Sequence, residues 1–335
     1  TTEIYTLSLH DALPIFLDRL EPCFQDLEVL AVHGQGEPLL GDLEYFVEQS
    51  VKSRFVLHMN TSGFLLTKRL SDLLSQTRLS IRFSVHAGAP ETYRRIMGHD
   101  LGKVKRNVSY LVDMARESGH ASDFWFSFLV MKENVREIEA FLHLAHDCGI
   151  KSVRFMRPIP NFKTLRGARL PDRDFRFFYF EQFNRKICRQ FVESLPRYRA
   201  LCDELGIRIE SGSLSPSRGS HHPLLESINT MMLPLLGNKL FPLRKLPGFC
   251  LAPWIGQLVV NLEGNVRLCC STTYSLGNLH QSTLPEIWNS RKMKEVRAAF
   301  ARGHRPKACG YCQGFDFANY PSNSFIPRSS KATSP

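Results

Sequence analysis

Residues 27–159 alternate between apolar runs typical of strands and amphipathic runs typical of helices, which restricts the fold more than any other feature of the sequence. Strands are expected over residues 27–34, 54–63, 80–88, 123–131 and 151–159, and helices over residues 43–52, 66–76, 104–119 and 135–149. Apolar strands joined by helices form parallel sheets that helices cover. The sequence therefore predicts a β/α barrel or an open doubly wound sheet, with ligands at the carboxyl ends of the strands.

Glycine and polar residues follow the first three predicted strands. His33–Pro38 reads HGQGEP, in which the glycines let the backbone approach a ligand closely. From this stretch alone, a glycine-rich turn between strand and helix is the simpler interpretation. The next two strand ends read Asn60-Thr-Ser-Gly and Ser84-Val-His-Ala-Gly. These residues are the candidates for a binding site at the edge of the sheet.

Five of the nine cysteines stand close together near the carboxyl end of the chain. They are Cys250, Cys269, Cys270, Cys309 and Cys312. Residues 256–268 predict a β-hairpin with its turn at Glu263-Gly-Asn, which brings the first cysteine near the next two. The Cys-x2-Cys pair that ends the segment can reach one metal centre. Four thiolates suit either zinc or an iron–sulfur cluster, and the softness of the ligands does not separate the two.

The length and composition predict one large core and a small additional module. No run approaches the roughly 20 apolar residues that span a bilayer, so no membrane partner is expected. An odd number of cysteines with metal-like spacing indicates the reducing cytoplasm. Residues 161–200 and 290–307 carry most of the net charge of +11. We interpret them as solvated helix faces and do not expect nucleic acid as a partner.

Residues 161–247 predict a helical insertion and linker. A helix is expected over residues 172–193, with Phe175, Phe178, Ile187 and Phe191 on one face. A further helix ends and a short strand follows within residues 200–210, and residues 211–222 have the composition of a loop.

Both ends of the chain are set apart from the folded segments. Residues 1–15 resemble a translated sequencing-library adapter, because Thr2–Ile15 match its codons without a mismatch, so native sequence is expected from about Phe16. Residues 321–335 are expected to be a disordered tail. The predicted segments between them are 16–160, 161–247 and 248–320.

The cysteine segment resembles the SPASM domain of radical S-adenosylmethionine (radical SAM) proteins, in which one cysteine is followed by Gly-x4-Cys and then by Cys-x2-Cys. Gly264-Asn-Val-Arg-Leu-Cys269 supplies the middle phrase, and residues 276–297 resemble the family's helix with Ile-Trp-Asn-Ser. The resemblance implies one auxiliary [4Fe-4S] cluster over residues 248–320, because no cysteine follows the last one. Its implied ligands are Cys250, Cys269, Cys309 and Cys312, with Cys270 as the rival of Cys269.

Residues 24–160 resemble the radical SAM barrel. HGQGEP is similar to the family's Gly-Gly-Glu-Pro motif, which binds the amino group of S-adenosylmethionine. The cofactor-binding residues implied by the resemblance are Gly34, Gly36, Glu37, Pro38, Asn60, Ser62 and Ser84. Met97 stands where many relatives have an arginine for the cofactor carboxylate, so that contact is absent or falls to Arg94 or Arg95. The implied fold is α/β, a partial (β/α)6 TIM-like barrel over residues 16–160 that lacks its first strand.

The Cys-x3-Cys-x2-Cys loop of radical SAM enzymes, which holds their catalytic [4Fe-4S] cluster, is not found here, since only Cys23 precedes Glu37. We attribute this to loss together with the adapter and expect the chain as written to be inactive, with its catalytic residues unknown. The intact parent is expected to be an oxidoreductase-like enzyme that cleaves S-adenosylmethionine reductively to a 5'-deoxyadenosyl radical. The resemblance implies a peptide or protein substrate and a reductant such as flavodoxin or ferredoxin.

Two other functions fit the same residues. A noncatalytic iron–sulfur cluster-binding protein is favoured if the natural gene lacks the cysteine triad. A zinc-stabilised interaction module is favoured if the protein holds zinc and no sulfide. The motifs around Glu37 favour the enzyme over both.

Overall fold

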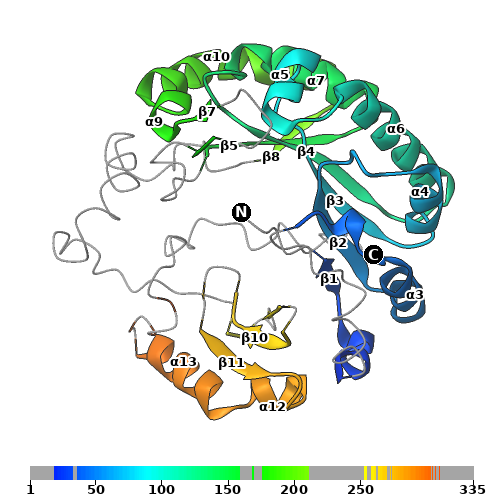
Figure 1. Cartoon of the computed structure of the whole chain (residues 1–335), viewed down its shortest axis with the longest axis vertical. Coiled ribbons are helices and arrows are strands. Elements are labelled where there is room, and N and C mark those ends of the chain that lie inside the picture. Colours follow the sequence, from blue (N-terminus) through cyan, green and yellow to red (C-terminus); the bar gives the residue numbers. More distant parts are fainter. Residues whose placement is uncertain are drawn as a thin grey trace, which may run out of the picture. The chain divides into compact units, whose positions relative to one another are not determined.

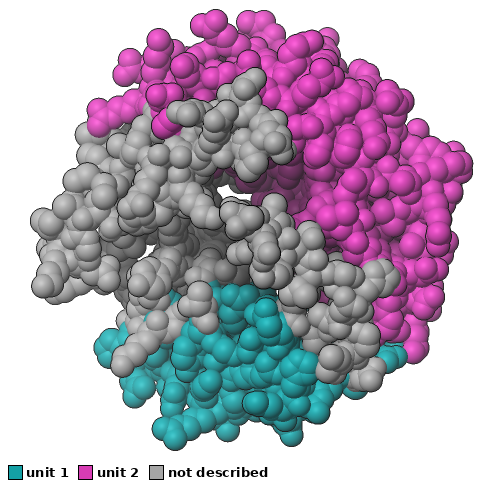
Figure 2. Space-filling view, viewed as in Figure 1, with its two compact units in different colours: residues 1–29, 238–335 teal, residues 30–237 magenta. Residues whose placement is uncertain are grey.

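The structure is a computed structural model of the 335-residue chain. It describes residues 19–32, 36–158, 168–169, 176–210, 253–254, 258–261, 263–269, 272, 274–302, 304, 306 and 309. The chain divides into two compact units, residues 1–29 with 238–335 and residues 30–237 (Figure 2). The predictions for residues 1–15 and 321–335 concern segments outside the described residues. No described helix combines the length and the apolar character that a membrane span requires.

A six-stranded sheet organises the larger unit, with helices along one side of it (Figure 1). Its strands, in spatial order, are β1 (Val29–Val32), β2 (Val56–Thr61), β3 (Leu79–Ser84), β4 (Asp123–Leu129), β5 (Ser152–Met156) and β8 (Arg208–Glu210). The pairs from β2 to β8 are parallel. The predicted alternation is confirmed, and so is the α/β fold class. The sixth strand comes from the segment expected to be insertion and linker.

Helices connect these strands. They are α3 (Glu44–Ser53), α4 (Lys68–Leu74), α5 (Pro90–Met97), α6 (Leu101–Glu117), α7 (Ile138–Asp147) and α10 (Arg185–Glu204). Short 3-10 helices are η1 (Glu21–Asp26), η2 (Pro38–Leu40) and η3 (Val135–Glu137). Two short strands, β6 (Ala168–Arg169) and β7 (Arg176–Phe177), pair antiparallel before the short helix α9 (Tyr179–Gln182).

The two faces of the sheet differ in chemistry. On the helix-covered face, Phe126 and Phe128 lie against Phe141 of α7, and Phe155 lies against Phe191 of α10. The strands are parallel and in register, so the alternate residues form the opposite face. Its side chains include polar and cationic residues beside a few apolar ones: Asn60, Arg82, Ser84, Ser127 and Arg154, with Trp125, Leu129 and Met156. This opposite face is the one that is available for a ligand.

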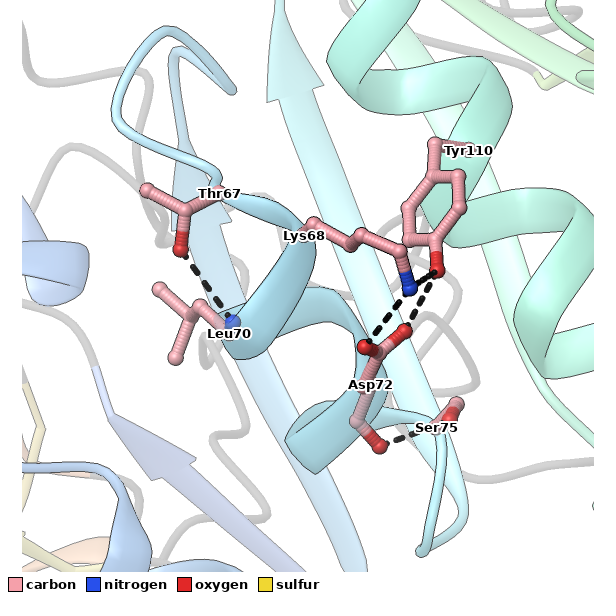
Figure 3. Close-up of polar contacts among 6 residues, drawn as sticks. All are labelled: Thr67, Lys68, Leu70, Asp72, Ser75 and Tyr110. Atoms are coloured by element: carbon pink, nitrogen blue, oxygen red, sulfur yellow. Dashed lines mark hydrogen bonds and ion pairs between the residues drawn. The ribbon is translucent and has the colours of Figure 1, made fainter.

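Polar contacts on the outer surface join α4 to α6 (Figure 3). Tyr110 of α6 donates a hydrogen bond to Asp72 Oδ1 at 2.6 Å, and Lys68 Nζ donates to the Tyr110 hydroxyl at 2.7 Å. Thr67 caps α4 by accepting a hydrogen bond from Leu70 N. The network fixes the two helices side by side over the strands that carry the candidate site.

The helix predicted over residues 172–193 is wrong in its extent. The described chain contains β7, then α9, and a break at residues 183–184 before α10 begins. The Asn184 side chain accepts hydrogen bonds from Lys186 N at 3.0 Å and Ile187 N at 3.2 Å, so it caps a new helix. Of the expected apolar stripe, Ile187 and Phe191 are buried in α10, Phe178 precedes α9, and Phe175 lies outside the described residues.

The smaller unit contains a three-stranded antiparallel sheet and two helices. They are β9 (Val259–Val260), β10 (Asn265–Arg267), β11 (Ser275–Asn278), α12 (Leu284–Trp288) and α13 (Arg291–Ala301). The predicted hairpin is confirmed, with Gly264 in its turn at φ 74°. A Cβ at that position would lie 3.1 Å from the His280 ring, so both the backbone angle and the space favour glycine. A buried cluster that includes Val266, Leu268 and Cys309 forms the core of this unit.

Candidate functional site

Glu37 joins the loops that follow the first two strands of the sheet. Its Oε2 accepts hydrogen bonds from Ser62 N and from Ser62 Oγ, each at 3.0 Å. Among the described residues, its Oε1 accepts one hydrogen bond, a long one of 3.4 Å from Leu39 N, as the cap of η2. Gly36 and Pro38 flank it in the same loop, and Gly34 lies outside the described residues. One carboxylate oxygen therefore retains most of its capacity to accept hydrogen bonds.

Two buried polar atoms near this carboxylate have no hydrogen-bond partner among the described residues. Asn60 Oδ1 lies on the open face of β2, and the Tyr93 hydroxyl lies in the first turn of α5. Burial, with a smaller effect of the Glu37 charge, raises the pKa of Tyr93. Ser84 lies at the carboxyl end of β3, and its side chain makes no hydrogen bond within the described part of the chain. An unsatisfied buried acceptor such as Asn60 Oδ1 suits a ligand that carries N–H groups.

The loops after β3 and β4 are tied together by residues that the sequence did not single out. Asn134 is fully buried, and its Nδ2 donates to His86 O and Leu129 O, each at 2.8 Å, while its Oδ1 accepts from Met131 N at 2.8 Å. These bonds fix the backbone of the loops after β3 and β4 at the carboxyl ends of the strands, which we call the open edge of the sheet.

Glu137 makes a second tie between the same two loops. Its Oε2 accepts hydrogen bonds from Gly88 N and Ala89 N, each at 3.0 Å, and its Oε1 accepts from the Thr92 hydroxyl. The carboxylate thus caps the amino end of α5, the helix that follows β3 and its last residue, Ser84. No local signal in the sequence marks this role, because the partners are 45 to 49 residues apart.

His86 is held neutral on the edge of this site. Its Nδ1 accepts a hydrogen bond from Leu129 N at 3.2 Å. Burial is the main effect that lowers the pKa of His86, and the positive charge of Arg82 lowers it further. The resulting pKa is about 4. The ring therefore acts as a structural acceptor near neutral pH.

The two arginines considered for the cofactor carboxylate have different surroundings. Arg95 forms an ion pair with Glu133, with 2.9 Å between its guanidinium nitrogen and the carboxylate oxygen. Arg94 is exposed on α5. Arg95 is therefore engaged at the end of α5, and the assignment of either residue to the cofactor stays a prediction.

Of the cysteines predicted to bind the cluster, Cys269 and Cys309 belong to the described residues, whereas Cys250, Cys270 and Cys312 lie outside them. Cys309 is buried in the same core cluster as Leu268, which directly precedes Cys269. The fold therefore brings the middle and the last part of the cysteine pattern to one core. Among the described residues alone, no three metal-binding side chains form a group, which is expected when half of the ligand set lies outside them.

Comparisons with known proteins agree with this arrangement. Residues 250–313 match the SPASM family model, described as an iron-sulfur cluster-binding domain. The fold is similar to that of SuiB from Streptococcus suis, with a TM-score of 0.56, 13% identity, and coverage of 96% of this chain and 70% of that chain. It is also similar to anSMEcpe with bound AdoMet, with a TM-score of 0.53, 17% identity, and coverage of 91% and 77%. No curated protein matches the chain in sequence.

Further matching structures of these two proteins contain ligands. SuiB was solved bound to S-adenosylmethionine and bound to the precursor peptide SuiA. The protein anSMEcpe was solved with AdoMet and the Cp18Cys peptide. Residues 250–313 therefore match a SPASM iron–sulfur cluster-binding domain, and the fold of the chain is similar to that of SuiB and anSMEcpe.

Proposed function

We propose that the chain belongs to a radical SAM/SPASM enzyme that modifies a peptide or protein. The observation that carries the proposal is the joint occurrence of a SPASM match with an open sheet edge at which Asn60 Oδ1 is buried and has no partner among the described residues. The solved relatives of the same fold bind S-adenosylmethionine and peptides, which supports the choice of cofactor and substrate class.

In this proposal the strand ends bind S-adenosylmethionine through Gly34, Gly36, Glu37, Pro38, Asn60, Ser62 and Ser84. Glu37 Oε1 has the remaining capacity to accept a hydrogen bond from the cofactor's ammonium group. Ser62 keeps the carboxylate in place through its two hydrogen bonds. A positioned carboxylate of this kind needs no rearrangement when the cation arrives.

The auxiliary [4Fe-4S] cluster is proposed to lie on Cys250, Cys269, Cys309 and Cys312. When bound, a cluster of this type binds substrate or accepts an electron. Cys309 is already desolvated, which excludes water from that side of the centre. The reductant is proposed to be a flavodoxin or a ferredoxin.

We further propose that the 335-residue polypeptide binds S-adenosylmethionine without cleaving it, because no Cys-x3-Cys-x2-Cys precedes Glu37 in its sequence. Reductive cleavage needs one electron from a cluster that contacts the cofactor. Incubation of the anaerobically reconstituted chain with dithionite and S-adenosylmethionine is therefore expected to yield no 5'-deoxyadenosine. Its formation in amounts above the enzyme concentration would disprove the inactivity.

Calorimetric titration of the full chain with S-adenosylmethionine tests the binding site. Asn60→Leu is expected to weaken binding about tenfold or more, because a hydrogen bond to a charged or polar ligand is lost in a buried site. Gln49→Leu is the matched control, since Gln49 Oε1 is also buried without a partner but lies on α3. The proposal fails if the unmodified chain does not bind, or if both variants bind equally well.

Metal analysis separates the proposal from the zinc-stabilised module. Anaerobically purified and reconstituted chain is expected to hold about four irons and four sulfides per polypeptide. About one zinc without sulfide would favour the interaction module.

A further inference from the structure

Arg267 lies beside the turn that carries a cysteine of the SPASM domain. It is the last residue of β10, two positions before Cys269. Its guanidinium NH1 donates a hydrogen bond to Thr272 O at 3.3 Å, and Thr272 N donates to Cys269 O at 3.4 Å. The arginine therefore spans the turn from Cys269 to Thr272.

The charge of Arg267 is not balanced by any described residue. The side chain is half-buried, and its buried Nε has no hydrogen-bond partner in the part of the chain that the structure describes. No described carboxylate lies within ion-pair distance of it. Arg267 and Arg297 of this unit differ at Nε, since Arg297 donates its Nε to Pro253 O and stacks over Trp288 at 4.3 Å. A half-buried cation without an anion is unfavourable, so a negative charge is expected nearby.

Only part of the Arg267 guanidinium serves the turn. NH1 satisfies Thr272 O, and a neutral amide could do the same. Of its other N–H groups, the buried Nε is directed to no protein acceptor that the structure describes. A role in shaping the turn therefore accounts for one hydrogen bond but not for the charge or for Nε.

We propose that Arg267 supplies the counter-charge and a hydrogen bond for the iron–sulfur cluster on Cys269, and thereby makes that cluster easier to reduce. The inference rests on the proposed function, because it requires the cluster. An iron–sulfur centre with four thiolates is anionic, and reduction adds one more negative charge. A neighbouring cation and an N–H donor stabilise the reduced form more than the oxidised form. Arg267 is thus a positioning and tuning residue and not a ligand.

The test is a redox titration of the reconstituted full chain, followed by the EPR signal of the reduced cluster. Arg267→Gln removes the charge and keeps an amide for Thr272 O, whereas Arg267→Lys keeps the charge. At the potential at which the unmodified protein is half reduced, the ratio of reduced to oxidised cluster in Arg267→Gln is expected to be about fivefold lower, because one nearby cation is lost. Arg267→Lys is expected to stay close to the unmodified protein.

Lys294→Gln is the matched control, because it removes one exposed positive charge of the same unit, on α13. It is expected to leave the midpoint potential unchanged. Iron and sulfide are measured for every variant. If Arg267→Gln holds a full cluster with an unchanged midpoint, or if Lys294→Gln shifts the midpoint equally, the inference is overturned while the cluster stands. If the unmodified chain holds no cluster, the proposed function is what has failed.

Discussion

Replacement of Asn134 by alanine is the most direct way to test how the open edge of the sheet is held together. The side chain has no exposed surface and makes three hydrogen bonds of 2.8 Å. The bond to His86 O joins the loop after β3 to the loop after β4, and the bonds with Leu129 O and Met131 N hold the second loop in shape. Alanine leaves two carbonyl oxygens, those of His86 and Leu129, and the N–H of Met131 without this partner.

The expected loss in the free energy of unfolding follows from these three bonds. Each buried group that loses its partner costs about 1 to 3 kcal/mol, and water that enters the small space recovers part of the loss. We therefore expect Asn134→Ala to destabilise the larger unit by about 3 to 5 kcal/mol. Asn134→Asp is expected to be at least as harmful, because it places a carboxylate oxygen against two carbonyl oxygens.

Unfolding in urea, followed by the fluorescence of Trp125, measures this loss within the unit that contains the sheet. The other two tryptophans, Trp254 and Trp288, are changed to phenylalanine in the background so that only this unit is observed. Asn107→Ala is the graded control, since its half-buried amide donates only to Gly63 O and Phe64 O, each at 3.1 Å. A loss below about 1 kcal/mol for Asn134→Ala would refute the reasoning.

Three further changes probe other contacts of the same unit. Gly88→Ala is expected to destabilise it in the same urea assay, because a Cβ would overlap the backbone of Glu137, which cannot yield as a side chain can. Tyr110→Phe should raise the pKa of Asp72 toward its ordinary value in an NMR titration, since the phenol is the main cause of its lowering. His86 has a folded pKa near 4, below its value in the unfolded chain, so stability should be fully present above about pH 6.5 and fall toward pH 4. His86→Gln should remove that fall.

The strands and most helices could be predicted from the sequence because their apolar periods are strong. The boundaries moved where a polar side chain caps a helix. The helix expected from residue 104 begins at Leu101, since the Asp100 side chain accepts hydrogen bonds from Gly102 N and Lys103 N. The break at Asn184 has the same cause. Within a few residues of a helix end, the capping side chain and the apolar periodicity can indicate different boundaries. The periodicity alone does not show at which residue the helix begins.

The contacts that hold the candidate site could not be read from the sequence. Glu37 was identified, but as a ligand for the cofactor, and its bonds to Ser62 were not foreseen. No sequence pattern singles out Asn134 or Glu137, because an isolated asparagine or glutamate in a loop has no periodic or spaced partner. Their roles arise only when parallel strands bring distant loops to one edge. Cys269 and Cys309 could be proposed as ligands from the sequence, because metal sites constrain the spacing itself, and their role as ligands stays a prediction.

Some polar groups of the candidate site have hydrogen-bond partners and others do not. Substitution of a group without a partner is predicted to have opposite effects on stability and on ligand binding. Glu37, Asn134 and Glu137 use their side chains to bind backbone groups, whereas the buried Asn60 Oδ1 has no partner within the described ranges. Asn60→Leu should therefore stabilise the free protein by about 1 kcal/mol or more while it weakens the binding of S-adenosylmethionine. Urea unfolding and calorimetry of the same variant measure both quantities. If stability and binding fall together, Asn60 holds the fold and its oxygen is not reserved for a ligand.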